Sequence, residues 1–175
     1  NNPVMNRVAN FMARLTTRGY NDIIISAMAC TARYLIDNAA KLSRYKTDGH
    51  PRDDAVDLVV AQSSVDILLP SSLLLPYWKE MINALSSIVQ NRENNPSIEV
   101  ILKRVQLSQD VTTMLLKSLK TTPISKLMLS KNNLGKHGFE FVADVLDTST
   151  SLTCLYIESN HIESKDVAAT FANAL

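Results

Sequence analysis

The chain has 175 residues, of which 46% are hydrophobic and 20% are charged, and its formal net charge is +1 at pH 7. This balance is typical of a folded chain and leaves little room for long disordered tails. The small net charge conceals four blocks, residues 1–52, 53–102, 103–137 and 138–175, which carry +5, −5, +6 and −5. Such blocks indicate either a basic surface for nucleic acid beside acidic flanks, or complementary faces within the molecule.

Two further features bear on the compartment in which the chain resides. Cys30 and Cys154 form neither a disulfide framework nor a C-x-x-C motif, so we expect reduced thiols in an intracellular compartment. The most apolar stretch, residues 65–78, contains Asp66, two prolines and two serines. We therefore expect no membrane-spanning segment.

The sequence predicts a helix from residue 3 onwards. Asn2 suits the N-cap, Pro3 suits the first helical position, and Gly19 can end the helix. The apolar side chains that share one face are Val4, Val8, Phe11, Met12 and Leu15.

Residues 23–25 are three isoleucines, a short β-branched run that predicts a buried strand. A second helix is expected to begin at Ser26 or Thr31, with an apolar face of Ala32, Leu35, Ile36, Ala39 and Leu42. Residues 41–54 are polar, contain Gly49 and Pro51, and predict a loop.

Residues 55–69 predict one or two strands, and residues 98–102 alternate like a further strand. Between them, residues 77–90 predict a helix whose apolar stripe is Trp78, Met81, Ile82, Leu85 and Val89. For Trp78, packing in a core or interface is the favoured interpretation, and stacking on a base is the alternative. The order of elements is that of an α/β fold.

Four segments of this half carry a recognisable pattern. They are N-P-V-M-N-R-V at 2–8, I-I-I-S-A-M-A at 23–29 leading into A-R-Y-L-I-D at 32–37, Q-S-S-V-D at 62–66, and S-I-E-V-I-L at 97–102. Together they resemble the Alba family of small nucleic-acid-binding proteins, over residues 2–69 and 97–104. The resemblance implies an Alba-like domain over residues 1–104, with a mixed sheet and two helices, that pairs with another Alba-like chain. It also implies that residues 70–96 are a helical insertion into a hairpin, and that the first strand lies before Asn1.

The resemblance implies a nucleic-acid face, which carries over only in part. Two lysines precede P-V-M-N in the family, where this chain has Asn1 and Asn2. The turn before the second helix is basic in archaeal members, whereas this chain has Ser26, Met28 and Cys30. Asn and Ser can donate to phosphates, but they lack the charge that supplies most non-specific affinity. The expected contacts to RNA are Asn1, Asn2, Arg7, Arg33, Lys41, Arg44, Lys46, Arg52, Lys103 and Arg104.

The second half contains one pattern twice. Ile124, Leu127, Leu129, Asn132 and Leu134 recur 28 residues later as Leu152, Leu155, Ile157, Asn160 and Ile162. The pattern L-x-x-L-x-L-x-x-N-x-L is that of a leucine-rich repeat, and the L-G-x-x-G-F turn at 134–139 resembles the ribonuclease-inhibitor class. The alternating leucines predict a short half-buried strand, followed by a helix. The Asn has no apolar role, so we expect it to hydrogen-bond backbone groups of the turn that leaves the strand.

A shorter unit is expected before these two, because Leu102, Val105 and Leu107 repeat the spacing of Ile124, Leu127 and Leu129. A single unit cannot cover its own core, so at least about three are expected. The last helix reaches Leu175 without a polar cap, and we therefore expect repeats over residues 105–175 that are truncated at the C-terminus.

The repeat class implies a concave face that holds a protein partner. The residues expected to contact it are Lys126, Met128, Ser130, Tyr156 and Glu158. Met128 and Tyr156 are suitable anchors. The alternative is that so short an array only caps the neighbouring domain.

The sequence gives no support for catalysis. His50, His137 and His161 are scattered, and no Cys or carboxylate completes a set of ligands. The glycine-rich phosphate-binding motifs and the G-x-S-x-G motif of hydrolases are missing. We expect no enzyme activity, no metal and no cofactor.

These observations predict an Alba-like α/β domain that continues into a short leucine-rich-repeat solenoid. The leading functional hypothesis is a non-enzymatic, RNA-associated scaffold subunit of a ribonucleoprotein complex, which binds RNA through its first domain and protein through its repeats. The alternative is a pure protein–protein interaction module with a degenerate nucleic-acid face.

Overall fold

The computed structural model describes residues 2–48, 56–62, 69–88, 98–161 and 165–174. Its first helix, α1, spans Pro3–Thr17, as the sequence predicts. The side chain of Asn2 caps α1 by accepting a hydrogen bond from the backbone N–H of Val4 at 3.0 Å. The buried residues of α1, which are Val8, Phe11 and Leu15, form the apolar face by which it packs against the next helix.

The second helix, α2, spans Asp22–Asp48, so the predicted strand at residues 23–25 is wrong. Asn21 starts the helix by accepting a hydrogen bond from the N–H of Ile24 at 2.9 Å. Buried residues then recur every three or four positions: Ile25, Met28, Ala29, Ala32, Leu35, Ile36, Ala39 and Leu42. A continuous apolar face contributes more stability than the strand propensity of three residues, and helix therefore prevails. The same helix includes residues 41–48 of the loop predicted for residues 41–54, and residues 49–54 lie outside the described part of the chain.

The sheet has four strands, β1 (Val56–Ala61), β2 (Ile98–Lys103), β3 (Ile124–Met128) and β4 (Cys154–Tyr156), paired in the order β1-β2-β3-β4. All three pairs are parallel, so the predicted mixed sheet is wrong for the described strands. β1 and β2 do not form the predicted hairpin. Parallel neighbours need a crossover connection, and the segment predicted as an insertion supplies it.

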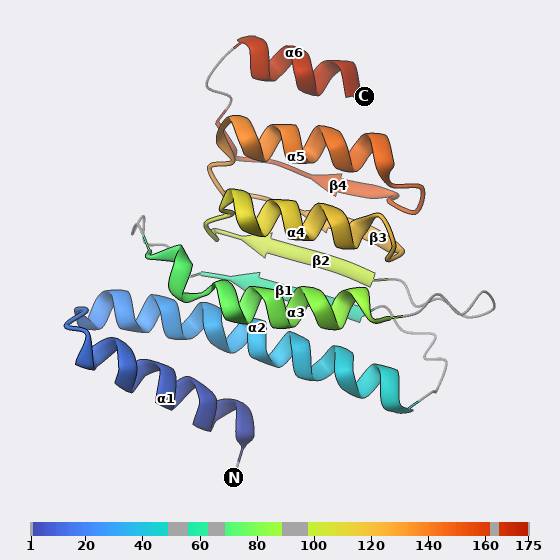
Figure 1. Ribbon diagram of the computed structural model, residues 1–175. Coiled ribbons are helices and arrows are strands. Elements are labelled where there is room, and N and C mark those ends of the chain that lie inside the picture. The colour runs from blue at the N-terminus through green and yellow to red at the C-terminus, as the bar shows by residue number, and fades with distance from the viewer. Residues whose placement is uncertain (1, 49–55, 63–68, 89–97, 162–164, 175) are drawn as a thin grey trace.

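Each described strand is followed by a helix. Residues 71–86 form the 3₁₀ turn η1 (Ser71–Leu73) and α3 (Leu75–Ser86), and the next helices are α4 (Gln109–Leu119), α5 (Gly135–Thr148) and α6 (Lys165–Ala174). Figure 1 shows α3, α4, α5 and α6 stacked in chain order, with α1 and α2 beyond α3. The predicted domain boundary at residues 104/105 falls between β2 and α4, and the sheet continues across it from β2 to β3.

The core lies between the sheet and these helices. Alternate residues of β1 and β2 face it and are buried. In β1, Val56, Leu58 and Val60 are buried while Asp57 is exposed. Gly138 belongs to the same packing, because a Cβ there would approach the Cβ of Leu134 to 2.6 Å. The other face of the sheet therefore carries the remaining strand side chains.

Candidate protein interface on the sheet

One edge of the sheet is closed by α2. In β1 the carbonyls of alternate residues point away from β2, and side chains of α2 lie against three of them. Lys41 Nζ donates to the carbonyl of Asp57 at 2.6 Å, and Asn38 Nδ2 donates to that of Val59 at 2.9 Å. The Cys30 thiol lies 3.8 Å from the carbonyl of Ala61. The helix thus satisfies backbone groups that an uncovered edge strand would leave to water or to another chain.

Two asparagines, of which Asn132 is buried and Asn160 partly exposed, connect successive strands. Asn132 Nδ2 donates to the carbonyl of Leu102 at 2.8 Å, and Asn132 Oδ1 accepts from the N–H of Val105 at 2.9 Å. One unit later, Asn160 Nδ2 donates to the carbonyl of Leu129 at 2.7 Å and Oδ1 accepts from the N–H of Asn132 at 2.9 Å. The prediction that the repeated Asn hydrogen-bonds backbone groups is confirmed. These partners lie at the end of the preceding strand or in the turn after it, and Asn160 also donates to the carbonyl of Ile157 in its own unit at 2.9 Å. We call this series the asparagine ladder.

The strand register corrects the predicted short unit. Val100, not Val105, lies opposite Leu127 in the β2–β3 pairing, so the strand of this unit is 98–103 and not 102–107. Val105 occupies the position that Asn132 holds in the next unit. The turns after the strands repeat as well, since Arg104, Lys131 and Ser159 each have a positive φ, of 56°, 60° and 56°. The backbone thus places Arg104 and Lys131 at equivalent positions along the carboxyl ends of the strands.

The open face of the sheet, which we call the strand face, carries a row of apolar side chains in register. Val59 lies opposite Ile101, Ile101 opposite Met128, and Met128 opposite Tyr156. We call these four residues the apolar row. The first three are partly exposed, and Tyr156 at the end of the row is 46% exposed. Met128 and Tyr156 were predicted as partner contacts, whereas Val59 and Ile101 were missed because their strands lack the repeat motif. The alternation of buried and open positions within residues 56–61 and 98–103 was the signal that could have identified them.

A polar row flanks the apolar row towards the amino ends of the strands. It consists of Asp57, Glu99, Lys126 and Cys154, paired across the sheet in that order. Lys126 Nζ lies 3.4 Å from Glu99 Oε2 and 5.6 Å from the centre of the Tyr156 ring. Lys126 is therefore positioned by its neighbours within the face, and its charge is largely offset by Glu99.

Basic side chains flank the apolar row at the carboxyl ends of the strands. Lys103 and Lys131 are exposed and Arg104 is partly exposed, and no described acid pairs with any of the three. We call these residues the basic rim. Glu158, another predicted contact, is exposed after β4 at the same end. Ser130, also a predicted contact, is only 3% exposed, and its buried hydroxyl has no hydrogen-bond partner in the described part of the chain.

Several residues predicted to bind RNA are engaged within the chain. Arg7 donates two hydrogen bonds to Glu80 on α3, Arg33 lies 3.7 Å from Asp37, and Lys41 closes the edge of β1. Arg44 donates to the carbonyl of Ala40, and Asn2 caps α1. Asn1, Arg52 and the side chain of Lys46 lie outside the described residues. Lys103 and Arg104 remain available at the surface, as members of the basic rim.

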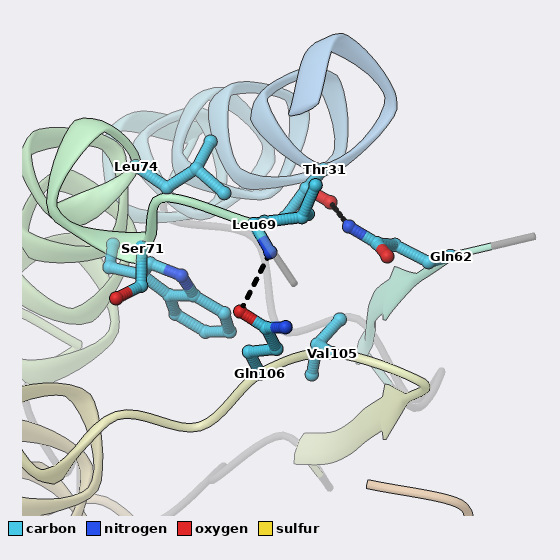
Figure 2. A pocket seen from close by; sticks show the side chains of 8 residues that line it. Thr31, Gln62, Leu69, Ser71, Leu74, Val105 and Gln106 are labelled. Atoms are coloured by element: carbon cyan, nitrogen blue, oxygen red, sulfur yellow. Dashed lines mark hydrogen bonds between the residues drawn. The ribbon is translucent and has the colours of Figure 1, made fainter. Parts of the chain in front are cut away.

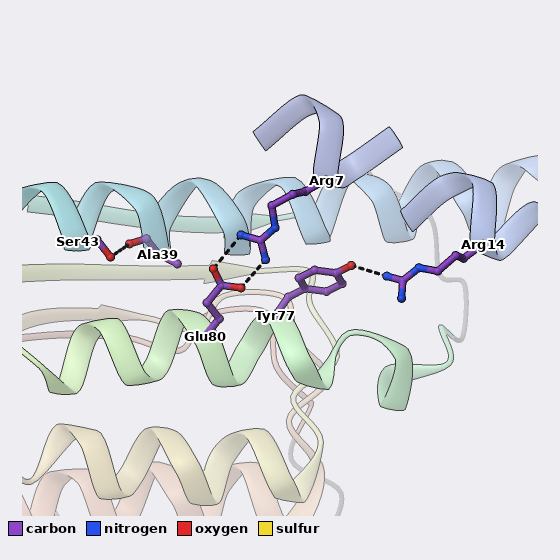
Figure 3. Close-up of polar contacts among 6 residues, drawn as sticks. All are labelled: Arg7, Arg14, Ala39, Ser43, Tyr77 and Glu80. Atoms are coloured by element: carbon purple, nitrogen blue, oxygen red, sulfur yellow. Dashed lines mark hydrogen bonds and ion pairs between the residues drawn. The ribbon is translucent and has the colours of Figure 1, made fainter. Parts of the chain in front are cut away.

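The Arg7 and Glu80 pair fastens α1 to α3 (Figure 3). The hydrogen bond from Arg7 holds the pKa of the Glu80 carboxyl below its usual value of 4.5, and the same bond raises the pKa of Arg7. Beside it, Arg14 donates to the Tyr77 hydroxyl at 2.9 Å. These contacts give the cations of α1 a structural role.

A small cavity lies near the carboxyl ends of β1 and β2 (Figure 2). The residues that line it are Thr31, Gln62, Leu69, Ser71, Leu74, Trp78, Val105 and Gln106, and its volume is about 10 Å³. That volume holds roughly one water molecule and no organic ligand. Trp78 is 2% exposed, which confirms its assignment to the core.

His137 Nε2 lies 2.8 Å from the carbonyl of Leu107, His161 is exposed, and His50 lies outside the described residues. No group of three or more potential metal ligands forms within the described ranges.

Among the same residues, no helix combines the length and apolar character that a membrane span requires. Comparisons of the chain with protein-family models, with curated proteins and with solved structures found no match.

Proposed function

We propose that the chain is a non-enzymatic protein-binding module built from leucine-rich repeats, and that a partner protein binds its strand face. Two observations support the repeat assignment. The two motif copies supply β3 and β4 in parallel register, and each motif asparagine donates a hydrogen bond to a carbonyl at the end of the preceding strand. The apolar row carries the functional proposal, because four apolar side chains in register on an open face form a continuous surface that excludes water when covered.

The proposal is tested with the double substitution Met128→Asp and Tyr156→Asp, which places two charges in the apolar row. The tagged chain is used to isolate proteins from its native cells, and the double variant is expected to lose at least one partner that the unaltered chain retains. The matched control is Asn83→Asp with Thr113→Asp, which adds the same charges at exposed positions on α3 and α4. Equal recovery of every partner by both variants would contradict the proposal. Circular dichroism establishes that both variants are folded.

An RNA-associated scaffold ranks second, and the basic rim is the observation that favours it. Its other supports are weaker, because the strand and the hairpin implied by the Alba resemblance are replaced by a helix and a parallel crossover. If RNA binds through the rim, the logarithm of the measured affinity should fall linearly with the logarithm of the salt concentration. The double substitution Lys103→Glu with Lys131→Glu should make this slope smaller.

A further inference from the structure

We propose that the partner element on the strand face is an amphipathic α-helix that lies across the strands and carries acidic residues along the flank that faces the basic rim. This inference rests on the proposed function, and it specifies the geometry and charge of the partner at the same site. It depends on the spacing of the apolar row, on the distribution of charge around the row, and on the buried hydroxyl of Ser130.

The spacing of the row favours a helix over an extended peptide. Neighbouring strands lie about 4.8 Å apart, so the four residues of the row span about 14 Å. One turn of helix advances about 5.4 Å, so three turns advance about 16 Å. Apolar side chains on successive turns are therefore displaced from the residues of the row by only about 2 Å at its far end. An extended segment that crosses the strands presents side chains on one side about 6.7 Å apart, so its side chains would be displaced from the residues of the row by about 6 Å at the far end. A helix of roughly three turns therefore meets each strand with one apolar side chain.

The charges on the two sides of the row differ. Towards the carboxyl ends stand Lys103, Arg104 and Lys131, opposed by Glu158 beyond β4. Towards the amino ends stand Asp57 and Glu99, with Lys126 paired to Glu99. A helix lying on the row thus has a net positive neighbour on one flank and a net negative neighbour on the other. Acidic residues on the first flank complement this arrangement and fix the orientation of the helix about its axis.

Ser130 adds a donor at the same flank. By strand alternation it shares the strand face with Met128, and it lies between the strands that lead to Lys103 and Glu158. Its hydroxyl is buried without a partner among the described residues, a state that costs free energy until an acceptor arrives. A carboxylate from the partner that reaches Ser130 supplies that acceptor.

A second copy of this chain is a poor occupant of the site. Among the described residues, the exposed large apolar side chains on helices are Met5 and Met12 on α1, which are 46% and 38% exposed, and Ile23 in the first turn of α2. The charged residues of α1 are Arg7 and Arg14, and the helix contains no acid. Docked on the row, α1 would place cations beside the basic rim, and like charges there oppose binding.

The test uses fluorescent synthetic peptides of about three helical turns and measures binding by anisotropy. The first peptide has leucines spaced alternately three and four apart and glutamates on one flank. The second has lysines in place of the glutamates, and the third has the composition of the first with prolines that prevent helix formation. We expect the first peptide to bind at least about tenfold more tightly than either of the others.

Two variants locate the bound peptide. Lys103→Glu with Lys131→Glu is expected to weaken the glutamate peptide by about tenfold or more and to improve binding of the lysine peptide. Met128→Asp with Tyr156→Asp is expected to abolish binding of both. The control, Lys79→Glu with Lys165→Glu, reverses two exposed charges on α3 and α6 and should change neither affinity.

Other outcomes would overturn the inference. The inference is wrong if the glutamate peptide does not bind, or if the proline peptide binds with equal affinity. It is also wrong if Lys103→Glu with Lys131→Glu leaves the affinity for the glutamate peptide unchanged. Displacement of the glutamate peptide by a uridine oligonucleotide of similar length, with tighter binding of the oligonucleotide, would assign the rim to RNA. If a cellular partner depends on Met128 and Tyr156 but not on Lys103 and Lys131, the proposed function stands and this inference fails.

Discussion

The two ends of the sheet are built differently. At the first edge, α2 lies along β1 and donates hydrogen bonds to its outward carbonyls, and the core residues of β1 are almost fully buried. At β4, Leu155 occupies the repeat position of Leu127 but is only partly buried, whereas Leu127 is 1% exposed. Where α2 covers the edge strand β1, the residues behind that strand are buried. At β4, which has a described neighbour on one side only, the equivalent residues are more exposed.

The largest effect that this contrast predicts comes from truncating the two equivalent leucines. Leu127→Ala should destabilise the chain by about 3 kcal/mol, because it opens a cavity in a closed core. Leu155→Ala should cost about 1 kcal/mol, since its site is already partly hydrated. Urea unfolding monitored by circular dichroism measures both. Equal losses would mean that β4 is packed as tightly as β3.

The asparagine ladder gives the next effect. Asn132→Ala leaves the buried carbonyl of Leu102 and the N–H of Val105 without partners, and we expect a loss of roughly 2 kcal/mol. Asn160→Ala removes equivalent bonds at a partly exposed site, where water can replace the side chain, so about 1 kcal/mol is expected. The same unfolding measurement applies. A larger loss of stability for Asn160→Ala than for Asn132→Ala would contradict the expectation that β4 is less tightly packed than β3.

The helical cover of β1 is tested at Asn38, which is 6% exposed. Asn38→Leu keeps the branched shape of the side chain but leaves the Val59 carbonyl without its donor, at a cost of about 1 kcal/mol. Hydrogen exchange should show faster exchange of β1 amides in this variant and unchanged exchange in β3. Unaltered protection of β1 would show that α2 covers the edge by apolar packing alone.

The sequence determined some of these features and left others open. The two motif copies fixed β3, β4 and the bonding of both asparagines, because a repeat carries its own register. Alternation within residues 56–61 and 98–103 identified strands but not their relative direction, and a hairpin was predicted where a crossover exists. The apolar row could be read only in part, since Met128 and Tyr156 lie in the repeats, whereas Val59 and Ile101 join them only through pairing between strands distant in sequence.

Ser130 illustrates a second limit. Its position in the motif predicts an exposed strand residue, and Lys126 and Met128 of the same strand are indeed partly exposed. Exposure of a short polar side chain also depends on the longer side chains of neighbouring strands, however, and the sequence of one unit does not contain that information. Burial of Ser130 therefore emerges only when the strands are assembled.

The smallest effect concerns the contact that holds α1 at the covered end. Because the folded-state pKa of Glu80 lies below its unfolded value, the Arg7 and Glu80 pair contributes stability at neutral pH that is lost as the pH falls through the folded-state pKa. Both side chains are more than 40% exposed, so the contribution should be less than about 1 kcal/mol. Between pH 7 and about pH 3, unfolding stability should fall slightly less in Glu80→Gln than in the unaltered chain. Glu140→Gln, which removes a looser pair with Lys136 on α5, is the control, and a larger change in this variant would place the acid-sensitive contact away from α1.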